Sequence, residues 1–202
     1  MIRTSKAALA AIVSLGIAGT PVSAPAQKYS DSFTFLKAVK DRDGNKATEI
    51  LANPASNAIN SREASSGEGA LHILVRDRDS NWLAFLLGKG ARTDLEDRNG
   101  DTPLSMAAQI GWVEGAQMLL GRRANVNAAN RAGVTPLILA VQRRDVAMVR
   151  LLLASGADPK RADNVTGLSA IDYAKRDNRA DTVLRLLEAP QTPARPMVGP
   201  TF

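Results

Sequence analysis

The sequence predicts an all-α fold, a solenoid of stacked helix–turn–helix repeats joined by short hairpin loops. A Gly-x-Thr-Pro-Leu segment at 100–104 recurs 33 positions later, and Leu-Leu pairs at 86–87, 119–120 and 152–153 follow the same interval. A fixed period of this length is typical of solenoids, in which each unit buries its apolar face by stacking on the next. The 202 residues are 45% hydrophobic but only 4% aromatic, which favours thin, closely stacked helices over one deep core.

The first 26 residues are expected to be a cleaved signal peptide. Arg3 and Lys6 precede an uncharged apolar run over 7–18, and the small residues at 24–26 fit a cleavage site that leaves Gln27 as the new N-terminus. The alternative, a membrane anchor, needs about 20 apolar residues, and this run is shorter. Cleavage would remove two cations and no anion, so the net charge would fall from +6 to +4.

The unit at 100–132 shows most clearly why these residues form two helices. Thr102 can cap the first helix, and Pro103 suits its first turn, where no N–H is needed. Gly111 suits a left-handed helix end. The second apolar stripe ends at Leu119 and Leu120, with the spacing of a helix that buries one side.

Three further units are expected along a repeat domain that spans residues 27–188. The unit at 67–99 lacks the Thr-Pro start, so its first turn should be looser. The unit at 133–166 has Arg144 in place of the helix-ending glycine and one extra residue near 163–166. The unit at 167–188 ends without a Gly-Ala turn and should be the C-terminal cap.

The two ends of the chain depart from the pattern. Residues 31–66 are expected to be a degenerate first unit, with an insertion near 43–46 and a long loop over 53–66. A terminal repeat can differ because one of its faces meets water. Residues 189–202 contain four prolines and are expected to be a disordered tail.

The unit at 100–132 resembles the ankyrin repeat, whose pattern is G-x-T-P-L-H-x-A-A-x-x-G-H, a second helix that ends in Leu-Leu, and then G-A-D-V-N. The matches are Thr102-Pro103-Leu104, Ala107-Ala108, Gly111, Leu119-Leu120, Ala124, Val126 and Asn127. Ser105 and Trp112 stand where the family usually has histidine, and Arg123 where it usually has glycine. The resemblance covers roughly residues 31–188 and implies a non-enzymatic protein-binding scaffold.

Proteins of this type usually bind with their hairpin tips and with the concave face of their first helices. Carried onto this chain, the resemblance predicts a protein-binding surface at Arg98, Asn99, Asp101, Gln109, Ile110, Trp112, Arg131, Val134, Gln142, Arg143, Lys175 and Arg176. The row turns more basic toward the C-terminus, which fits either ordinary surface charge or an acidic patch on a partner. Trp112 is expected to be partly exposed at the start of a second helix and could anchor that partner.

The sequence offers little for catalysis. There is no cysteine, and His72 is the only histidine, so a Cys-based metal site is absent and a catalytic triad would depend on this one residue. His72 occupies the histidine position of the repeat, where the resemblance implies a structural role. We therefore expect no catalytic, metal or cofactor-binding residue, although an unrecognised carboxylate site stays open as a remote alternative.

The sequence predicts an exported scaffold that binds another protein in the periplasm. The alternative is a secreted bacterial effector that binds a host or neighbouring-cell protein. The chain is expected to be monomeric, with no nucleic-acid partner, because its basic residues are interspersed with acids, and with no membrane span after cleavage.

Overall fold

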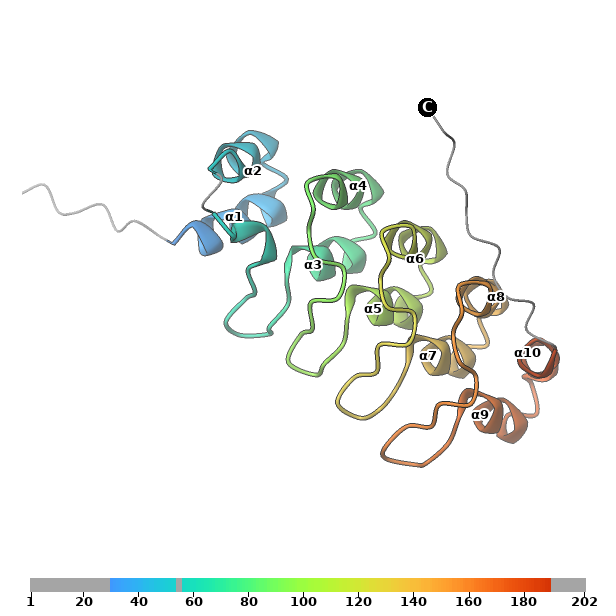
Figure 1. The fold of residues 1–202 in the computed structure, drawn as a ribbon. Coiled ribbons are helices and arrows are strands. Elements are labelled where there is room, and N and C mark those ends of the chain that lie inside the picture. Colours follow the sequence, from blue (N-terminus) through green and yellow to red (C-terminus); the bar gives the residue numbers. More distant parts are fainter. Residues whose placement is uncertain (1–29, 54–55, 190–202) are drawn as a thin grey trace, which may run out of the picture.

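The computed structural model describes residues 30–53 and 56–189, so the predicted signal peptide and most of the predicted tail lie outside the described residues. The described residues form ten α-helices in two layers (Figure 1). The inner helices are α1 Asp31–Asp41, α3 Ala70–Arg76, α5 Pro103–Ile110, α7 Pro136–Gln142 and α9 Ala170–Arg176. The outer helices are α2 Gly44–Leu51, α4 Ser80–Gly88, α6 Val113–Leu120, α8 Val146–Ala154 and α10 Asp181–Glu188. The predicted all-α solenoid is confirmed.

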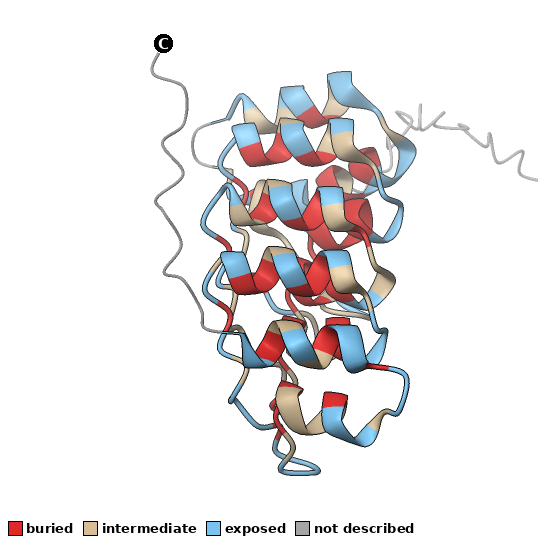
Figure 2. Cartoon of the chain, turned by 90° about the vertical axis from the view of Figure 1, so that its right-hand side faces the viewer, coloured by how far each residue is buried: buried red, intermediate tan, exposed pale blue. Residues whose placement is uncertain are grey.

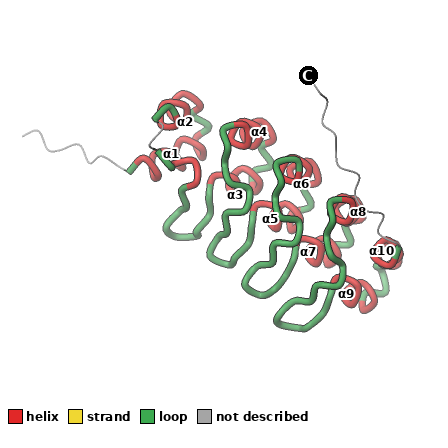
Figure 3. Tube along the Cα trace, in the orientation of Figure 1, coloured by secondary structure: helices red, strands yellow, loops and turns green. Residues whose placement is uncertain are grey.

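Hairpin loops project in a row from the inner layer, on the side away from the outer helices (Figure 1). They consist of turns and loops, and the described chain contains no strand longer than an isolated bridge (Figure 3). Those bridges pair Arg62 with Gly69 and Ala162 with Ser169. No helix within 30–53 and 56–189 is long and apolar enough to cross a membrane.

The core lies between and along the two layers. The outer helices carry buried residues on one side and exposed residues on the other, as the banding in Figure 2 shows, whereas residues 70–75 of α3 are all buried. Leu104, Leu137 and Leu152 are fully buried, and small residues such as Ala107 and Ala140 let neighbouring inner helices approach closely. This arrangement removes apolar surface from water without large aromatic side chains.

The inner helices begin with caps that the sequence predicts. The hydroxyls of Thr102, Thr135 and Ser169 accept hydrogen bonds from backbone N–H groups three residues later. Helix α3 has Gly69 at its capping position, and this residue has no side chain to act as a cap, as predicted. The Gly69 N–H instead donates to Nδ1 of His72 at 3.1 Å, so this first turn is held by the histidine.

Arginines end three of the inner helices in an unusual backbone conformation. Arg42, Arg78 and Arg144 have φ values of 59°, 53° and 55°, whereas the equivalent Gly111 has a φ of 69°. The left-handed region is unfavourable for a residue with a side chain. Each arginine reaches the next repeat: Arg42 pairs with Asp77 and Asp79, Arg78 donates to the carbonyl of Ile110, and Arg144 pairs with Asp177.

The first repeat differs from its expected form. We predicted an insertion near residues 43–46, and this is wrong: Asp43 caps α2 as Asp79 caps α4, 36 residues later, so the extra residues lie between α2 and the first hairpin. The segment over 53–66 is also not one long loop. Its described part contains a 3-10 helix, Ala58–Asn60, in which Ala58 is buried against the core.

The hairpins are linked to one another by backbone hydrogen bonds. Arg98 N–H donates to the carbonyl of Ser66, Arg131 N–H to that of Asn99, and Asn164 N–H to that of Ala132, at 2.8–3.0 Å. The last of these hairpins, at 163–168, holds the extra residue predicted near 163–166. This array fixes the spacing of the loops that border the inner helices.

Candidate functional site

The helix caps give the register of the inner helices. Counting from the cap, the seventh residue is Arg76, Gln109, Gln142 or Arg176, and the eighth is Asp77, Ile110, Arg143 or Asp177. Three contacts show that this side of the inner helices faces the hairpins. Arg76 pairs with Glu68 at 2.6 Å, Lys40 with Glu63 at 2.8 Å, and Tyr173 donates to Asp163 at 2.7 Å. These helix positions and the hairpin tips together form the concave face.

The middle of the concave face is apolar. Met106, Ile110 and Leu139 pack on the core but remain partly exposed. Gln109 and Gln142 are exposed beside them. A partly exposed apolar strip with polar neighbours has the composition expected of a protein-binding surface.

Three arginines on the C-terminal half of this face have no partner. Arg131, Arg143 and Arg176 are exposed, and within the described residues their side chains make no ion pair and no hydrogen bond. By contrast, two lysines near the N-terminal end of the face are paired, since Lys37 contacts Asp41 at 2.5 Å and Lys40 contacts Glu63 at 2.8 Å. Near α7 and α9, three guanidinium groups are therefore available to a partner without the loss of an ion pair.

The structure places the remaining predicted residues at several depths. Arg98 and Asn99 are exposed at a hairpin tip, where the Arg98 guanidinium donates to the carbonyl of Ala64. Asp101 and Val134 are half-buried at the hairpin bases. Asp101 accepts a hydrogen bond from the Asn130 side chain at 2.9 Å, so its carboxylate serves the hairpin array.

Two predicted residues do not belong to the concave face. Trp112 is only 7% exposed, so the expected part-exposed anchor is wrong. Its ring covers Gly115, where a Cβ would lie 2.1 Å from the ring, and the absence of that Cβ lets the indole fold onto α6. Lys175 is the sixth residue after the cap of α9, one before the first of the two positions that lie on the concave face. It pairs with Glu188 on α10 at 3.2 Å. The extra residue in the hairpin at 163–168 moved the equivalent positions of α9 one residue further along the chain.

The ionisable groups that could suggest catalysis are engaged in structural bonds. His72 is fully buried, and its Nε2 lies 2.9 Å from the carbonyl of Asp101 while Nδ1 accepts from Gly69. Burial lowers the pKa of this imidazole below its ordinary value. Thr166, through its hydroxyl and its N–H, and the Tyr173 hydroxyl donate to Asp163 and hold the pKa of that carboxyl well below its usual range.

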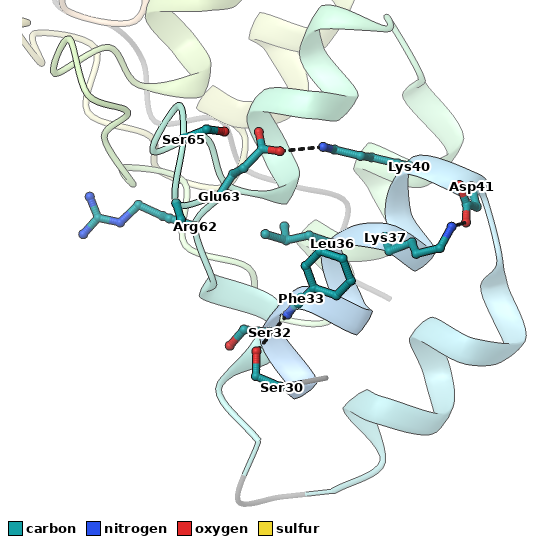
Figure 4. A pocket seen from close by; sticks show the side chains of 11 residues that line it. Ser30, Ser32, Phe33, Leu36, Lys37, Lys40, Asp41, Arg62, Glu63 and Ser65 are labelled. Carbon is teal, nitrogen blue, oxygen red and sulfur yellow. Dashed lines mark hydrogen bonds and ion pairs between the residues drawn. The ribbon is translucent and has the colours of Figure 1, made fainter. Parts of the chain in front are cut away.

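A cavity of about 510 Å³ lies at the N-terminal end of the concave face (Figure 4). It is bounded by α1 and by the first hairpin, with Phe33 and Leu36 on one side and Glu63 and Ser65 on the other. Phe33 is 52% exposed. The sequence analysis did not identify this site, because the apolar stripe of α1 alone does not show which of its residues is exposed.

Among the described residues, no group of three or more His, Cys, Asp or Glu side chains could hold a metal ion. The exposed and partly exposed groups described above on the concave face are apolar side chains, guanidinium groups and amides.

Comparison with known families agrees with this architecture. A family model described as ankyrin repeats in three copies matches residues 35–130, 71–163 and 116–195, overlapping segments that together span most of the chain. Ankyrin repeats act as scaffolds for protein–protein interaction and are generally non-enzymatic. The two layers of paired helices, the row of hairpins and the capped inner helices are the physical counterpart of that match, and the chain belongs to the ankyrin repeat family.

Proposed function

We propose that this protein is a non-enzymatic scaffold, exported to the periplasm, that holds another protein on its concave face. The observation that carries the proposal is the apolar strip of Met106, Ile110 and Leu139 beside three unpaired guanidinium groups. Apolar contact supplies most of the affinity in such an interface, and charge selects the partner and speeds its approach.

The charge pattern favours a partner with carboxylates next to an apolar segment. Within the described residues, the side chains of Arg131, Arg143 and Arg176 form no ion pair or hydrogen bond, so a partner's carboxylates meet no direct contact that must first be broken. Guanidinium groups can bind carboxylates through two parallel hydrogen bonds. Because these groups are exposed, binding should weaken as salt rises through the physiological range.

The arginine assignment is tested by charge reversal. The variant Arg143→Glu with Arg176→Glu should weaken capture of the partner from an extract of the source cell envelope by about tenfold or more, because two attractive contacts become repulsive. Its matched control is Arg150→Glu with Arg185→Glu, which makes the same charge change on the exposed sides of α8 and α10.

Both variants should unfold within a few degrees of the original chain, since exposed charges contribute little to stability. Equal capture by the concave variant, the control and the original chain would show that the partner does not use this face.

The export part of the proposal rests on the sequence over 1–26. Fractionation should recover the protein in the periplasm, with Gln27 as its first residue in mass spectra. A peptide that spans Ala26 and Gln27 in the exported protein would refute that cleavage site. Recovery from the culture medium alone would favour the secreted effector instead.

A further inference from the structure

The first hairpin has an open edge. Each later hairpin donates one backbone N–H to a carbonyl of the hairpin before it. The donors are Arg98, Arg131 and Asn164, which occupy equivalent positions at the start of their turns. The equivalent residue of the first hairpin is Ala64, whose N–H has no acceptor within the described residues. Helix α1 precedes this hairpin and has no described hairpin of its own.

The cavity beside α1 lies at this same edge. Ala64 lines it, together with Phe33 and Leu36 from α1 (Figure 4). In the later repeats, the preceding hairpin lies against the corresponding edge. Gly67 and Gly100 approach the backbone nitrogen of the following hairpin so closely that a Cβ would lie 2.8 Å from it. The cavity is therefore the place that a preceding hairpin would occupy.

Four of the five charged side chains around the cavity are paired with one another. Lys37 and Asp41 form one ion pair, Lys40 and Glu63 form another, and the Arg62 guanidinium donates to the carbonyl of Glu96 at 2.9 Å. A ligand that paired with Lys37, Lys40, Asp41 or Glu63 would have to displace one of these ion pairs. An uncharged segment with an apolar side chain would not.

We propose that this cavity binds an extended segment of a partner protein, which continues the hairpin array at its N-terminal end. A backbone carbonyl of the segment accepts the free N–H of Ala64, and an apolar side chain fills the space over Phe33 and Leu36. The Ala64 N–H of the hairpin array supplies the backbone hydrogen bond, as happens when an extended peptide adds to the exposed edge of a β-sheet. This site does not depend on the arginines of the concave face.

The probe is a phage library of random nine-residue peptides, selected on the purified protein. Enriched peptides should share an apolar residue in an uncharged context, and their synthetic forms should bind with micromolar affinity. Phe33→Ser, which removes the apolar wall, and Ala64→Glu, which places a charge in the cavity, should each weaken binding by about tenfold or more. The matched control is Val165→Ser, because Val165 is 77% exposed on the last described hairpin.

A second readout follows the backbone bond itself. The amide proton of Ala64 should shift downfield in NMR spectra as peptide is added, and the amide of Asn164 should not. Circular dichroism melts of the variants separate lost binding from lost folding.

Several results would overturn the proposal. The first is failure to enrich any peptide. The second is binding to Phe33→Ser that equals binding to the original chain. The third is binding that appears only after removal of the residues ahead of Ser30, which would assign the cavity to this chain's own leading segment. A Phe33-dependent dimer in sedimentation would assign it to a second copy.

Discussion

Trp112 and Gly115 depend on one another. The indole is buried because residue 115 has no side chain, and a Cβ there would lie 2.1 Å from one ring carbon and 2.3 Å from the next. A sequence pattern that marks the position after Gly111 as the start of a second helix cannot show this, because the burial of Trp112 is set by a neighbour three residues later. The position of the tryptophan was predicted, and its exposure was not.

Gly115→Ala should destabilise the protein by about 1–3 kcal/mol, because the ring must leave its place or the helix must shift. Urea unfolding followed by tryptophan fluorescence measures this. Gly88→Ala is the control: nothing lies within 4 Å of its Cβ position, and alanine in a helix is favoured over glycine by about 0.5–1 kcal/mol. Similar losses of stability in the two variants would contradict the packing argument.

His72 should make stability depend on pH. Its pKa in the folded state is lowered by burial, so the unfolded chain takes up the proton first as pH falls. Stability should therefore decrease as pH falls below about 6.5, the ordinary histidine value, and continue to decrease toward the folded-state pKa. In His72→Ser, which copies Ser105 of the next repeat, the decrease between pH 7.5 and 5 should be smaller in urea titrations. An equal decrease in both proteins would show that carboxylates alone cause it.

At the scale of the element, the helix starts were predictable and the helix ends less so. Thr102 and Thr135 act through bonds to residues three positions away, so the local sequence is sufficient to identify them. The sequence showed only that Arg144 replaces the helix-ending glycine, and not which residue its side chain contacts. Its contact with Asp177, 33 residues away, depends on how two repeats stack, and neither residue signals it alone. The misplaced insertion in the first repeat has a different origin. An Asp-Arg-Asp segment at 41–43 recurs at 77–79, 36 residues later, and this spacing could have placed the extra residues after α2.

The left-handed conformation of Arg144 sets the expected order of its variants. Arg144→Gly should relieve backbone strain of about 1 kcal/mol and lose an exposed ion pair that is worth less than about 1 kcal/mol, so its stability should be close to the original. Arg144→Ala keeps the strain and loses the pair, and should be about 1 kcal/mol less stable than Arg144→Gly in urea unfolding. An alanine variant as stable as the glycine variant would show that the strain is absent.

At the scale of the whole molecule, the first repeat is attached differently from the others. Helix α2 stands apart from α4 in Figure 1, whereas α4, α6 and α8 lie side by side. Two ion pairs of Arg42, at 2.8 Å to Asp77 and 2.6 Å to Asp79, join this repeat to the next. The sequence predicted the number of helices and their order, but not which junctions depend on charge, because ion pairing between repeats is a property of the assembled stack.

Loss of these two contacts should loosen the first repeat alone. In Arg42→Asn, where asparagine tolerates the left-handed backbone, amide exchange in α1 and α2 should accelerate by about three- to tenfold, while exchange in α5 to α8 stays unchanged. Hydrogen-exchange mass spectrometry resolves the two regions. Lys37→Gln is the control, because it removes an exposed pair within α1 only. Uniform acceleration along the chain would mean that the repeats open together.

The junctions between hairpins also bear on how the length of such a chain can change. A Cβ on Gly67 would lie 2.8 Å from the nitrogen and 3.1 Å from the Cγ of Arg98, and a Cβ on Gly100 would meet Arg131 at the same two distances. The two junctions have the same geometry. Excision of one 33-residue period would place Gly67 against Arg131 and form a junction of the same shape. Duplication or deletion of whole periods could therefore lengthen or shorten the binding face in a single genetic step, without the evolution of a new interface.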